Sequence, residues 1–542
     1  MSGFTIEDFG GIAPKIDAKR LGNSLAQTAS DCLLDSHALE PLPAMVATVD
    51  SAGATDISLY KYNASTWLHF TNDRDFARAP IANDALDRIV YTDPGTYPNV
   101  YSAGTTYRLG IPAPAAAPTL TGVTAPADPN DVDAESISYV VTMVDAWGAE
   151  GPPSPPSALT DRVVDTSVTV NLPTTPVGSY NFGGGALKRI YRSNSGTQGA
   201  NYQFVAEVAA ATASYADTIV NVALGEILPS ETWIGPPDDD TAIYPNGPME
   251  GVVALPNGVL AGFAHKSVVF SEPFLYHAWP LEYRITFEEL VVGITPIASG
   301  LLVVTEKRPY LIAGVHPGAM AVTTFEVNQA CVAKRGMVDM GDIAIYPSPD
   351  GLVLVSGSSI ELVTEGLLGR DDWQLYIPST ISAYYYEGKY LAFYNDGSPK
   401  GFIFDPQGGR NALTLIADYL EAAYYDALTD TLYVNDAGTI RKWGQSTSAA
   451  RNYTWKSKKL VAGSPTNMGA IRIETRNALS SENVTVKVYA DGTLTDTVVF
   501  NDSATPYSRL SGGFRAKVWE LEITGQNPVE HVGIYETLSE AV

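Results

Sequence analysis

The sequence predicts an all-β protein: a β-propeller core with one β-sandwich inserted into it and a second β-sandwich near the C-terminal end. Three observations predict this fold. Apolar and polar residues alternate over many short stretches, as they do in half-buried strands. Asn-Gly, Asp-Gly and Glu-Gly dipeptides, which favour tight hairpin turns, separate several of these stretches. The 47 Gly and 36 Pro residues supply the turns that many short strands need.

Residues 1–45 are predicted to be an N-terminal extension with one helix. Within the stretch LGNSLAQTASDCLLDS, apolar residues recur at helical spacing: Leu21, Leu25, Ala29, Cys32 and Leu33. Residues 46–110 alternate instead, in the runs DISLYKYN, STWLHFTND and DRIVYTDPG. Because Asn, Asp, Gly or Pro bounds each of these runs, we expect residues 46–110 to form the first propeller strands.

A composition rich in Pro and Ala marks a linker after residue 110, and a compact module follows at residues 115–235. Its strands alternate, and its order of segments, from YVVT through EGPPSPPS and RIYRS to SYADT, resembles a fibronectin type III-like β-sandwich. We expect Trp147 near the turn after its strand. The residues expected in the sandwich core are Tyr139, Tyr191, Phe204 and Tyr215.

Residues 240–445 repeat one pattern: an apolar strand, a turn dipeptide and another apolar strand. Recurrence at roughly 40–50 residues is typical of the four-stranded blades of a propeller. The turn dipeptides are Asn257-Gly258, Asp350-Gly351, Glu387-Gly388 and Asp396-Gly397. Residues 450–542 are predicted to be the C-terminal β-sandwich, because Val484, Val486 and Val488 alternate with polar residues.

The net charge of −26, from 34 basic and 60 acidic residues, argues against tight DNA or RNA binding, which needs clustered cations. In a conduit, the same charge would repel DNA and let it slide. Cys32 and Cys331 are expected to be buried thiols of a protein folded in a reducing cytoplasm. The sequence shows no signal peptide and no run long enough to cross a membrane, so no membrane insertion is expected.

Three segments carry a resemblance to a known family. The first is FGGIAPKIDAKRLGNSLAQTASDCLLDSHALEPLP, the second DRIVYTDPGTYPNVY and the third SGGFRAKVWELEITGQNPVEHV. Together they are similar to motifs of the tail nozzle, or tail tubular, proteins of short-tailed bacteriophages. One position departs from the pattern, because His37 follows Ser36 where the family usually has glycine. In the first segment the matching residues are Gly10, Gly11, Pro14, Ala26, Gln27, Leu34, Asp35 and Ser36.

The resemblance implies a structural virion protein of the phage tail, made in the host cytoplasm. It implies a ring, usually hexameric, at the distal end of the tail tube. An adaptor ring or other portal-proximal tail protein would bind above this ring, and tail fibres or spikes would bind at its sides. Genomic DNA would pass through its lumen during ejection without sequence-specific binding. The implied protein is no enzyme, with no catalytic residues, no metal and no cofactor.

The residues themselves offer weak candidates for chemistry. The histidines lack metal-ligand spacing, although His265 and His277 could meet across a hairpin. The sequence has no CxxC and no GxSxG elbow, and Gly183-Gly184-Gly185 lacks the features of a phosphate-binding loop. We interpret the tyrosine-rich strands as packing surfaces. These strands contain Tyr384, Tyr385, Tyr386, Tyr424 and Tyr425.

Carboxylates could support glycoside hydrolysis or cation binding, but 60 acidic residues place many side by side by chance. The adjacent sets are Asp238 to Asp240, Glu288 with Glu289, and Asp371 with Asp372. A loose Ca²⁺-like spacing is interpreted as an acidic turn; it consists of Asp128, Asp131, Asp133 and Glu135. The sequence also contains a cluster of lysines, Lys456, Lys458 and Lys459, which has two interpretations. These lysines lie on the edge strand of a sheet, or they face an acidic surface of a neighbouring subunit.

Two other functions remain open. A phage receptor-binding or glycan-cleaving tail protein would need an aromatic cleft beside spaced carboxylates and would be trimeric. A bacterial propeller used as a scaffold would be a stable monomer. Ring formation distinguishes the nozzle hypothesis from both.

Overall fold

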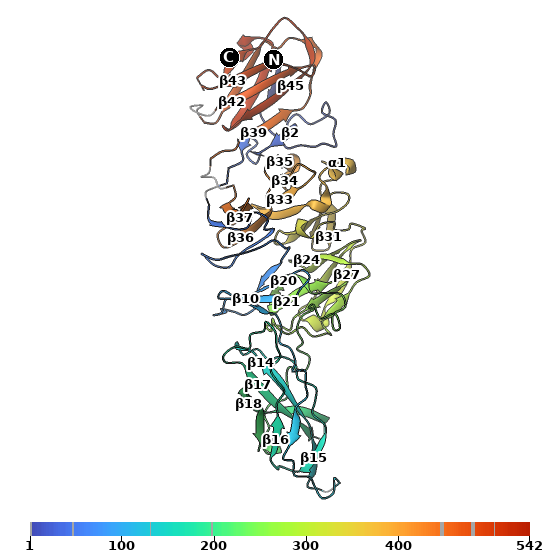
Figure 1. Cartoon of the computed structure of the whole chain (residues 1–542). Coiled ribbons are helices and arrows are strands. Elements are labelled where there is room, and N and C mark those ends of the chain that lie inside the picture. Colours follow the sequence, from blue (N-terminus) through green and yellow to red (C-terminus); the bar gives the residue numbers. More distant parts are fainter. Residues whose placement is uncertain are drawn as a thin grey trace. The chain divides into compact units, whose positions relative to one another are not determined.

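The computed structural model describes residues 3–45, 48–130, 132–196, 199–444, 449–477, 483–502 and 504–541. Almost every regular element within these residues is a β-strand, so the predicted all-β fold class is confirmed (Figure 1). The chain divides into two compact units. Unit 1 consists of Met1–Asn72, Ile297–Leu311 and Thr324–Val542, and unit 2 of Asp73–Pro296 and Ile312–Thr323.

Unit 1 contains four-stranded antiparallel sheets in which strands adjacent in sequence are adjacent in the sheet, as in a propeller blade. One consists of β28 (Val338–Asp339), β29 (Ile343–Pro347), β30 (Leu352–Ser356) and β31 (Ser359–Leu362). Another consists of β36 (Ala422–Asp426), β37 (Thr431–Asp436), β38 (Thr439–Lys442) and β5 (Asp50–Ser51). The pairing of Ile440 with Asp50 ties this second blade to the N-terminal part of the chain.

Two short strand pairs complete this part of unit 1. They are β6 (Ser58–Lys61) with β7 (Trp67–Phe70), and β3 (Cys32–Leu33) with β4 (Glu40–Pro41). The ring of Trp67 on β7 meets the ring of Tyr433 on β37 edge to face, with centroids 5.0 Å apart. Trp67 also meets Tyr424 on β36 edge to face, with centroids 6.0 Å apart, which agrees with the packing role expected of the tyrosine-rich strands.

A third blade-like group continues into a larger sheet of ten strands. The group is β32 (Ser382–Tyr386), β33 (Lys389–Tyr394), β34 (Lys400–Phe404) and β35 (Leu413–Ile416). The sheet then passes through β2 (Ala26–Ser30), β39 (Tyr453–Ser457), β45 (Ala516–Gly525), β42 (Val484–Ala490) and β43 (Thr493–Phe500), while β40 (Leu460–Thr466) pairs with β45. The N-terminal strand β2 therefore lies between a blade and the C-terminal strands.

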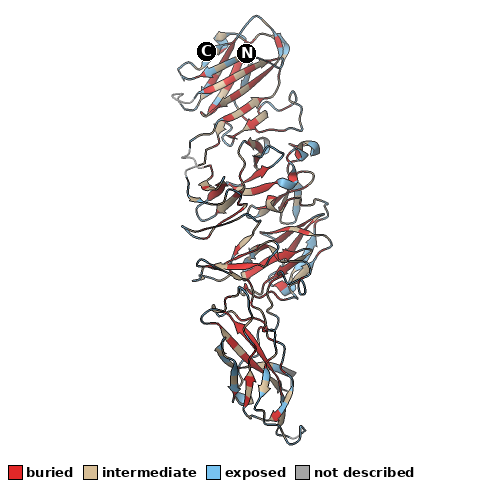
Figure 2. Cartoon of the chain, viewed as in Figure 1, coloured by how far each residue is buried: buried red, intermediate tan, exposed pale blue. Residues whose placement is uncertain are grey.

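The C-terminal sandwich of unit 1 has a second sheet. It consists of β1 (Gly3–Ile6), β46 (Val529–Tyr535), β41 (Ala470–Thr475) and β44 (Tyr507–Arg509). Gly3 pairs with Tyr535, so both ends of the chain belong to this sandwich (Figure 1). Side chains along β42 alternate between buried and half-buried, and Figure 2 shows buried positions along these strands. This alternation gives the sandwich its apolar interior.

The predicted N-terminal helix is wrong. The stretch forms turns up to Leu25 and then strands β2 and β3. The backbone of β2 pairs with β39, with Ala29 opposite Trp455, and Ala29 is fully buried. Asp31 then adopts a left-handed conformation with φ of 54°, which no continuing helix accepts. The apolar spacing was real, but backbone pairing with distant strands outweighs a local helical preference.

Unit 2 contains two blade-like sheets. One is β8 (Phe76–Arg78), β9 (Ile89–Tyr91), β10 (Asn99–Ser102) and β11 (Thr105–Arg108). The other is β20 (Glu250–Leu255), β21 (Val259–Ala264), β22 (Ser267–Phe270) and β23 (Arg284–Thr286). They share one apolar core that includes Val90, Leu260 and Trp279.

Between these two sheets in sequence lies the inserted sandwich. Its strands form three sheets. They are β14 (Tyr139–Val144), β17 (Leu187–Gly196) and β18 (Gly199–Ala209); β12 (Thr119–Thr121), β16 (Val168–Asn171) and β19 (Ser214–Asp217); and β13 (Ala134–Ile137) with β15 (Thr160–Val163). Tyr139 and Tyr191 are fully buried, whereas Phe204 and Tyr215 are half-buried. Trp147 packs edge to face on Tyr107 of β11, at a centroid distance of 5.1 Å.

The described residues contain four further strands and several short helices. Four strands lie where the chain passes between the units: β24 (Val291–Ile297), β25 (Gly300–Thr305), β26 (Pro309–Ala313) and β27 (Ala321–Thr324). In the described residues, α-helix is confined to α1 (Arg370–Gln374) and α2 (Leu538–Ala541). Single 3₁₀ turns occur at Asn221–Ala223, Pro256–Gly258, Pro317–Ala319, Lys334–Gly336, Pro378–Thr380 and Gly409–Asn411. No described helix is long and apolar enough to cross a membrane.

Candidate functional site

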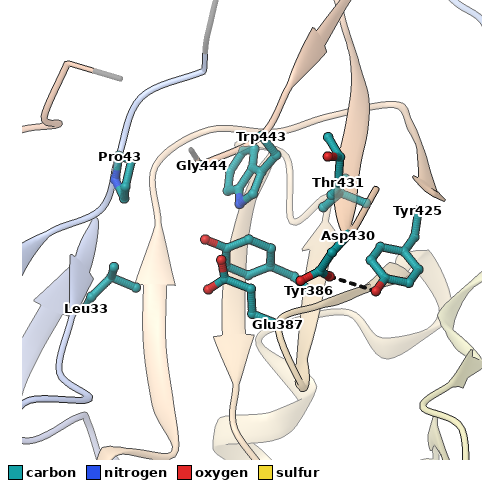
Figure 3. A pocket seen from close by; sticks show the side chains of 10 residues that line it. Leu33, Pro43, Tyr386, Glu387, Tyr425, Asp430, Thr431, Trp443 and Gly444 are labelled. Carbon is teal, nitrogen blue, oxygen red and sulfur yellow. Dashed lines mark hydrogen bonds between the residues drawn. The ribbon is translucent and has the colours of Figure 1, made fainter. Parts of the chain in front are cut away.

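A cavity of about 470 Å³ opens in unit 1 beside two hairpin turns (Figure 3). One turn joins β32 to β33 and carries Glu387, and the other joins β36 to β37 and carries Asp430. A cavity of this volume is in the range of small-molecule sites in proteins. The lining residues are Leu33, Pro43, Tyr386, Glu387, Tyr425, Asp430, Thr431, Leu432, Trp443 and Gly444.

The hairpin backbones hold both carboxyl groups at the cavity. Glu387 has φ of 47° and Gly388 φ of 76°, the two positive values of a type I′ turn. Asp430 is also left-handed, with φ of 46°. A left-handed conformation is costly for a residue with a side chain, and glutamate has no special tolerance for it. The folded hairpins therefore impose these two positions.

Burial and neighbouring charges shift the pKa of Glu387, one of these two carboxyl groups. Partial burial raises the pKa of Glu387, the negative charge of Asp430 adds to the shift, and the nearby ammonium of Lys389 opposes it. Lys389 is itself engaged with Asp35, at 2.6 Å between Nζ and Oδ2. Among the described lining residues there are two carboxylates and no basic side chain. The cavity therefore has an excess of negative charge.

Hydrogen bonding fixes one of the two carboxyl groups further. The phenol of Tyr425 donates to Oδ1 of Asp430 at 2.8 Å (Figure 3). Burial, followed by this bond and the charge of Asp430, raises the pKa of Tyr425 to about 12. The phenol therefore stays protonated at neutral pH and keeps donating to Asp430.

Trp443 forms the inner wall. Its side chain is 2% exposed, and one ring face is covered by the guanidinium of Arg451, 4.6 Å from the ring. Tyr386 meets Trp443 edge to face, with centroids 6.4 Å apart. The buried indole Nε1 has no hydrogen-bond partner among the described residues. In Figure 3 this nitrogen lies on the side of the ring that faces Tyr386 and Glu387.

The histidines singled out from the sequence are not alike. His265 is exposed in the turn between β21 and β22, with φ of 57°. His277 is buried, and its Nε2 donates to the carbonyl of Glu150 at 3.0 Å. Burial lowers the pKa of His277 to about 4; the hydrogen bond to the Glu150 carbonyl opposes this shift and the charge of Arg88 adds to it. His277 is therefore a neutral core histidine.

Carboxylates from two of the three adjacent sets have local hydrogen-bond partners. Asp238 and Asp239 both accept hydrogen bonds from Arg108, at 2.5 and 2.9 Å. Asp372 accepts from the backbone N–H of Gly369, which caps α1. In the Glu288–Glu289 pair, the backbone carbonyl of Glu288 accepts from Lys266.

The acidic residues with Ca²⁺-like spacing include one, Asp128, that makes a local hydrogen bond. Asp128 accepts from the backbone N–H of Asn130 at 2.9 Å, as in an acidic turn, whereas Asp131 lies outside the described residues. In the part of the chain that the structure describes, no group of three or more His, Cys, Asp or Glu side chains could hold a metal ion. Cys32 and Cys331 are free and buried, as predicted for both thiols.

The expectation of an edge strand is wrong for Lys456, whereas Lys458 and Lys459 lie between β39 and β40. Strand β39 lies inside the ten-stranded sheet, between β2 and β45. Lys456 lies 3.3 Å from the carboxylate of Glu520 and 4.5 Å from the ring of Tyr489. Lys458 donates to the side chain of Asn23. Lysine is typical of edges, but here the carboxylate of Glu520 gives Lys456 a partner in the sheet.

Sequence reasoning did not single out the cavity. It named Glu387 only as half of a turn dipeptide, Tyr386 and Tyr425 only as packing residues, and did not name Asp430 or Trp443. One signal was present: glutamate stands at a hairpin position that usually holds Asn, Asp or Gly. The remaining residues are brought together because separate sheets pack against one another in one apolar cluster.

Residues of the first and third motif segments meet in the ten-stranded sheet of unit 1. The side-chain amide of Gln27 on β2 donates to the carbonyl of Ser457 and to the carboxylate of Glu520, each at 2.7 Å. Gly11 lies against β35 so closely that a Cβ there would be 2.4 Å from the carbonyl oxygen of Leu413. The motif residues thus join strand β2 to its neighbours.

No protein-family model and no curated protein matches the chain. Solved structures do resemble it weakly. BamB from Moraxella catarrhalis covers 83% of the chain and 99% of its own length, with 11% identity and a TM-score of 0.31. The computationally designed Ika8 protein covers 74% and 100%, with 9% identity and a TM-score of 0.30. The WD40 β-propeller domain of Doa1 covers 74% and 97%, with 10% identity and a TM-score of 0.28.

Proposed function

We propose that the chain is a structural virion protein that forms the distal tail-tube ring, or nozzle, of a short-tailed phage. In this proposal the ring, a homohexamer, binds an adaptor ring or portal-proximal tail protein. It carries fibres or spikes, and genomic DNA passes through its lumen during ejection. The protein acts by shape and electrostatics, without a catalytic site, and is located in the virion tail.

The observation that carries the proposal is the bond between Gln27 and Glu520. Gln27 belongs to the N-terminal segment that resembles the nozzle family, and Glu520 belongs to the C-terminal one. Their side chains meet at 2.7 Å although 493 positions separate them in the sequence. Two motifs that resemble one family and also contact each other support membership in that family.

A departure from the family pattern supports the proposal in a second way. His37 stands where the family usually has glycine, and its φ is 65°. A positive φ favours glycine, because a side chain is crowded there. The backbone at this position therefore suits the family's residue better than the residue that the chain has.

The charge of the chain is compatible with a conduit. With a net charge of −26, the surface repels phosphate groups at short range, and this effect weakens as salt rises. DNA passing such a surface would be held in no fixed register. The proposed lumen needs this property, whereas a nucleic-acid-binding protein needs the opposite one.

Assembly tests the proposal. The purified chain would be mixed with the adaptor and other virion proteins encoded with it, then studied by light scattering and negative-stain microscopy. Rings of about six copies, formed alone or on the adaptor, are expected. A persistent monomer that never joins the adaptor would refute the nozzle, and a trimer would favour a receptor-binding or glycan-cleaving tail protein. Adding an unrelated acidic protein of similar mass controls for non-specific association.

A further inference from the structure

The cavity of unit 1 contains polar groups of two opposite kinds. Asp430 already accepts one hydrogen bond, from Tyr425, but a carboxylate can accept several, whereas the indole N–H of Trp443 has no partner among the described residues. Glu387 and Asp430 offer carboxylate oxygens, which only accept hydrogen bonds when ionised. Nε1 of Trp443 offers an N–H, which only donates, and it has no acceptor among the described residues. A buried donor without an acceptor costs free energy, so a ligand that accepts from it gains affinity.

This combination restricts the chemistry of a ligand. An ammonium ion or a metal cation would satisfy the carboxylates but would offer nothing to the indole N–H. An anion would satisfy the indole but would be repelled by Glu387 and Asp430. A hydroxyl group both donates and accepts, so a molecule with several hydroxyls satisfies both kinds of group.

The walls add an apolar component. Tyr386, Tyr425 and Trp443 contribute aromatic surface, and Leu33, Pro43 and Leu432 contribute aliphatic surface. Sugars combine hydroxyl edges with C–H faces, and the cavity has both kinds of wall. Its volume of about 470 Å³ accommodates one or two sugar rings.

We propose that this cavity binds a saccharide unit of mono- or disaccharide size. Sugar hydroxyls donate to the carboxylates of Glu387 and Asp430, and a sugar oxygen accepts from Nε1 of Trp443. The left-handed backbone conformations of Glu387 and Asp430 and the Tyr425–Asp430 bond hold the carboxylates before the ligand arrives. The inference does not rest on the ring proposed above, because every residue involved belongs to unit 1 of a single chain.

Saturation-transfer NMR on the purified full chain tests the site with glucose, galactose, mannose and N-acetylglucosamine at millimolar concentration. At least one sugar is expected to receive saturation from the protein.

Glu387→Gln keeps the size of the side chain and removes its charge, so affinity for that sugar should fall about tenfold. Trp443→Phe removes the N–H and should lower affinity about threefold or more. The matched control is Glu361→Gln, which changes an exposed glutamate on β31 and should bind as the unchanged chain does.

Thermal unfolding of each variant shows whether it folds as the unchanged chain does. If Trp443→Phe fails to fold, Glu387→Gln decides alone, because Glu387 is exposed in a turn. Three results would overturn the site: no sugar binds, Glu387→Gln binds with unchanged affinity, or ethylammonium binds in the cavity while the sugars do not. Ring formation is measured separately, so failure of one proposal leaves the other standing on its own evidence.

Discussion

Nε2 of Gln27 donates at 2.7 Å to Oε2 of Glu520, a carboxylate whose side chain is 4% exposed. Among the described residues, Glu520 also has a cationic partner, Lys456, whose Nζ lies 3.3 Å away. A buried carboxylate depends strongly on each of its donors, because water does not replace them. A polar contact shielded from water therefore joins β2, in the N-terminal motif, to β45, in the C-terminal motif.

Replacing Gln27 with Ala should lower the free energy of unfolding by about 1–3 kcal/mol, because the variant leaves a buried carboxylate short of a donor. Urea unfolding, followed by tryptophan fluorescence, measures the change. Gln407→Ala is the matched control, since Gln407 is exposed, and it should change stability little. Equal effects of the two substitutions would show that the Gln27–Glu520 contact contributes nothing particular.

The sequence allowed some features to be predicted because their causes are local. The Glu387-Gly388 turn follows from the backbone freedom of glycine, and it occurs between β32 and β33 as expected. Tyr139 was expected in a sandwich core from strand alternation, and it is fully buried. Such features depend on a few neighbouring residues, so a single sequence contains their signal.

Other features depend on partners that no local pattern identifies. The stretch around Ala29 has helical spacing, yet its backbone pairs with β39, more than 400 positions later. Lys456 was interpreted as an edge residue because nothing in its neighbourhood reveals Glu520. The cavity was missed for the same reason: Glu387 and Trp443 follow strands of two different sheets, which pack together in one apolar cluster.

A close backbone contact should make Gly11 intolerant of a side chain. A Cβ at Gly11 would be 2.4 Å from the carbonyl oxygen of Leu413, a distance that forces the N-terminal segment away from β35. Gly11→Ala should therefore destabilise the protein by about 1–3 kcal/mol, which thermal unfolding would detect. Gly463→Ala is the control, because a Cβ there meets nothing within 4 Å. Unchanged stability of Gly11→Ala would mean that this segment is not held against β35.

The inserted sandwich contains a fully buried ion pair. Arg192 and Asp217 are 0% exposed with 2.5 Å between nitrogen and oxygen, and the phenol of Tyr139 also donates to Asp217 at 2.6 Å. Asp217→Asn keeps the shape but leaves the arginine charge uncompensated, so the sandwich should lose about 3–5 kcal/mol. Hydrogen exchange of β14 and β17 should accelerate accordingly.

Glu207→Gln provides the comparison for that ion pair. Glu207 pairs with Arg189 at 2.7 Å, but its side chain is 36% exposed, so the loss should stay below about 1 kcal/mol. If Asp217→Asn exchanges no faster than Glu207→Gln, the buried pair does not stabilise the sandwich.

His277 should make stability depend on pH. Burial lowers its pKa to about 4 in the folded protein, against an ordinary value of 6.5. Between these two values the unfolded chain binds a proton that the folded chain does not. The free energy of unfolding should therefore be at its full value above pH 6.5 and fall as the pH drops toward 4, by about 3 kcal/mol in total. Structurally, protonation would add an N–H at Nδ1, which has no acceptor among the described residues.

Urea unfolding at several values between pH 7 and pH 4.5 separates this contribution from that of the carboxylates. His277→Gln removes the titrating ring, so its stability should fall less steeply with decreasing pH than that of the unchanged chain. His265→Gln replaces an exposed turn histidine and should keep the original slope. If His277→Gln and the unchanged chain lose stability in parallel, His277 is protonated as easily in the folded protein as in the unfolded one, and the burial argument fails.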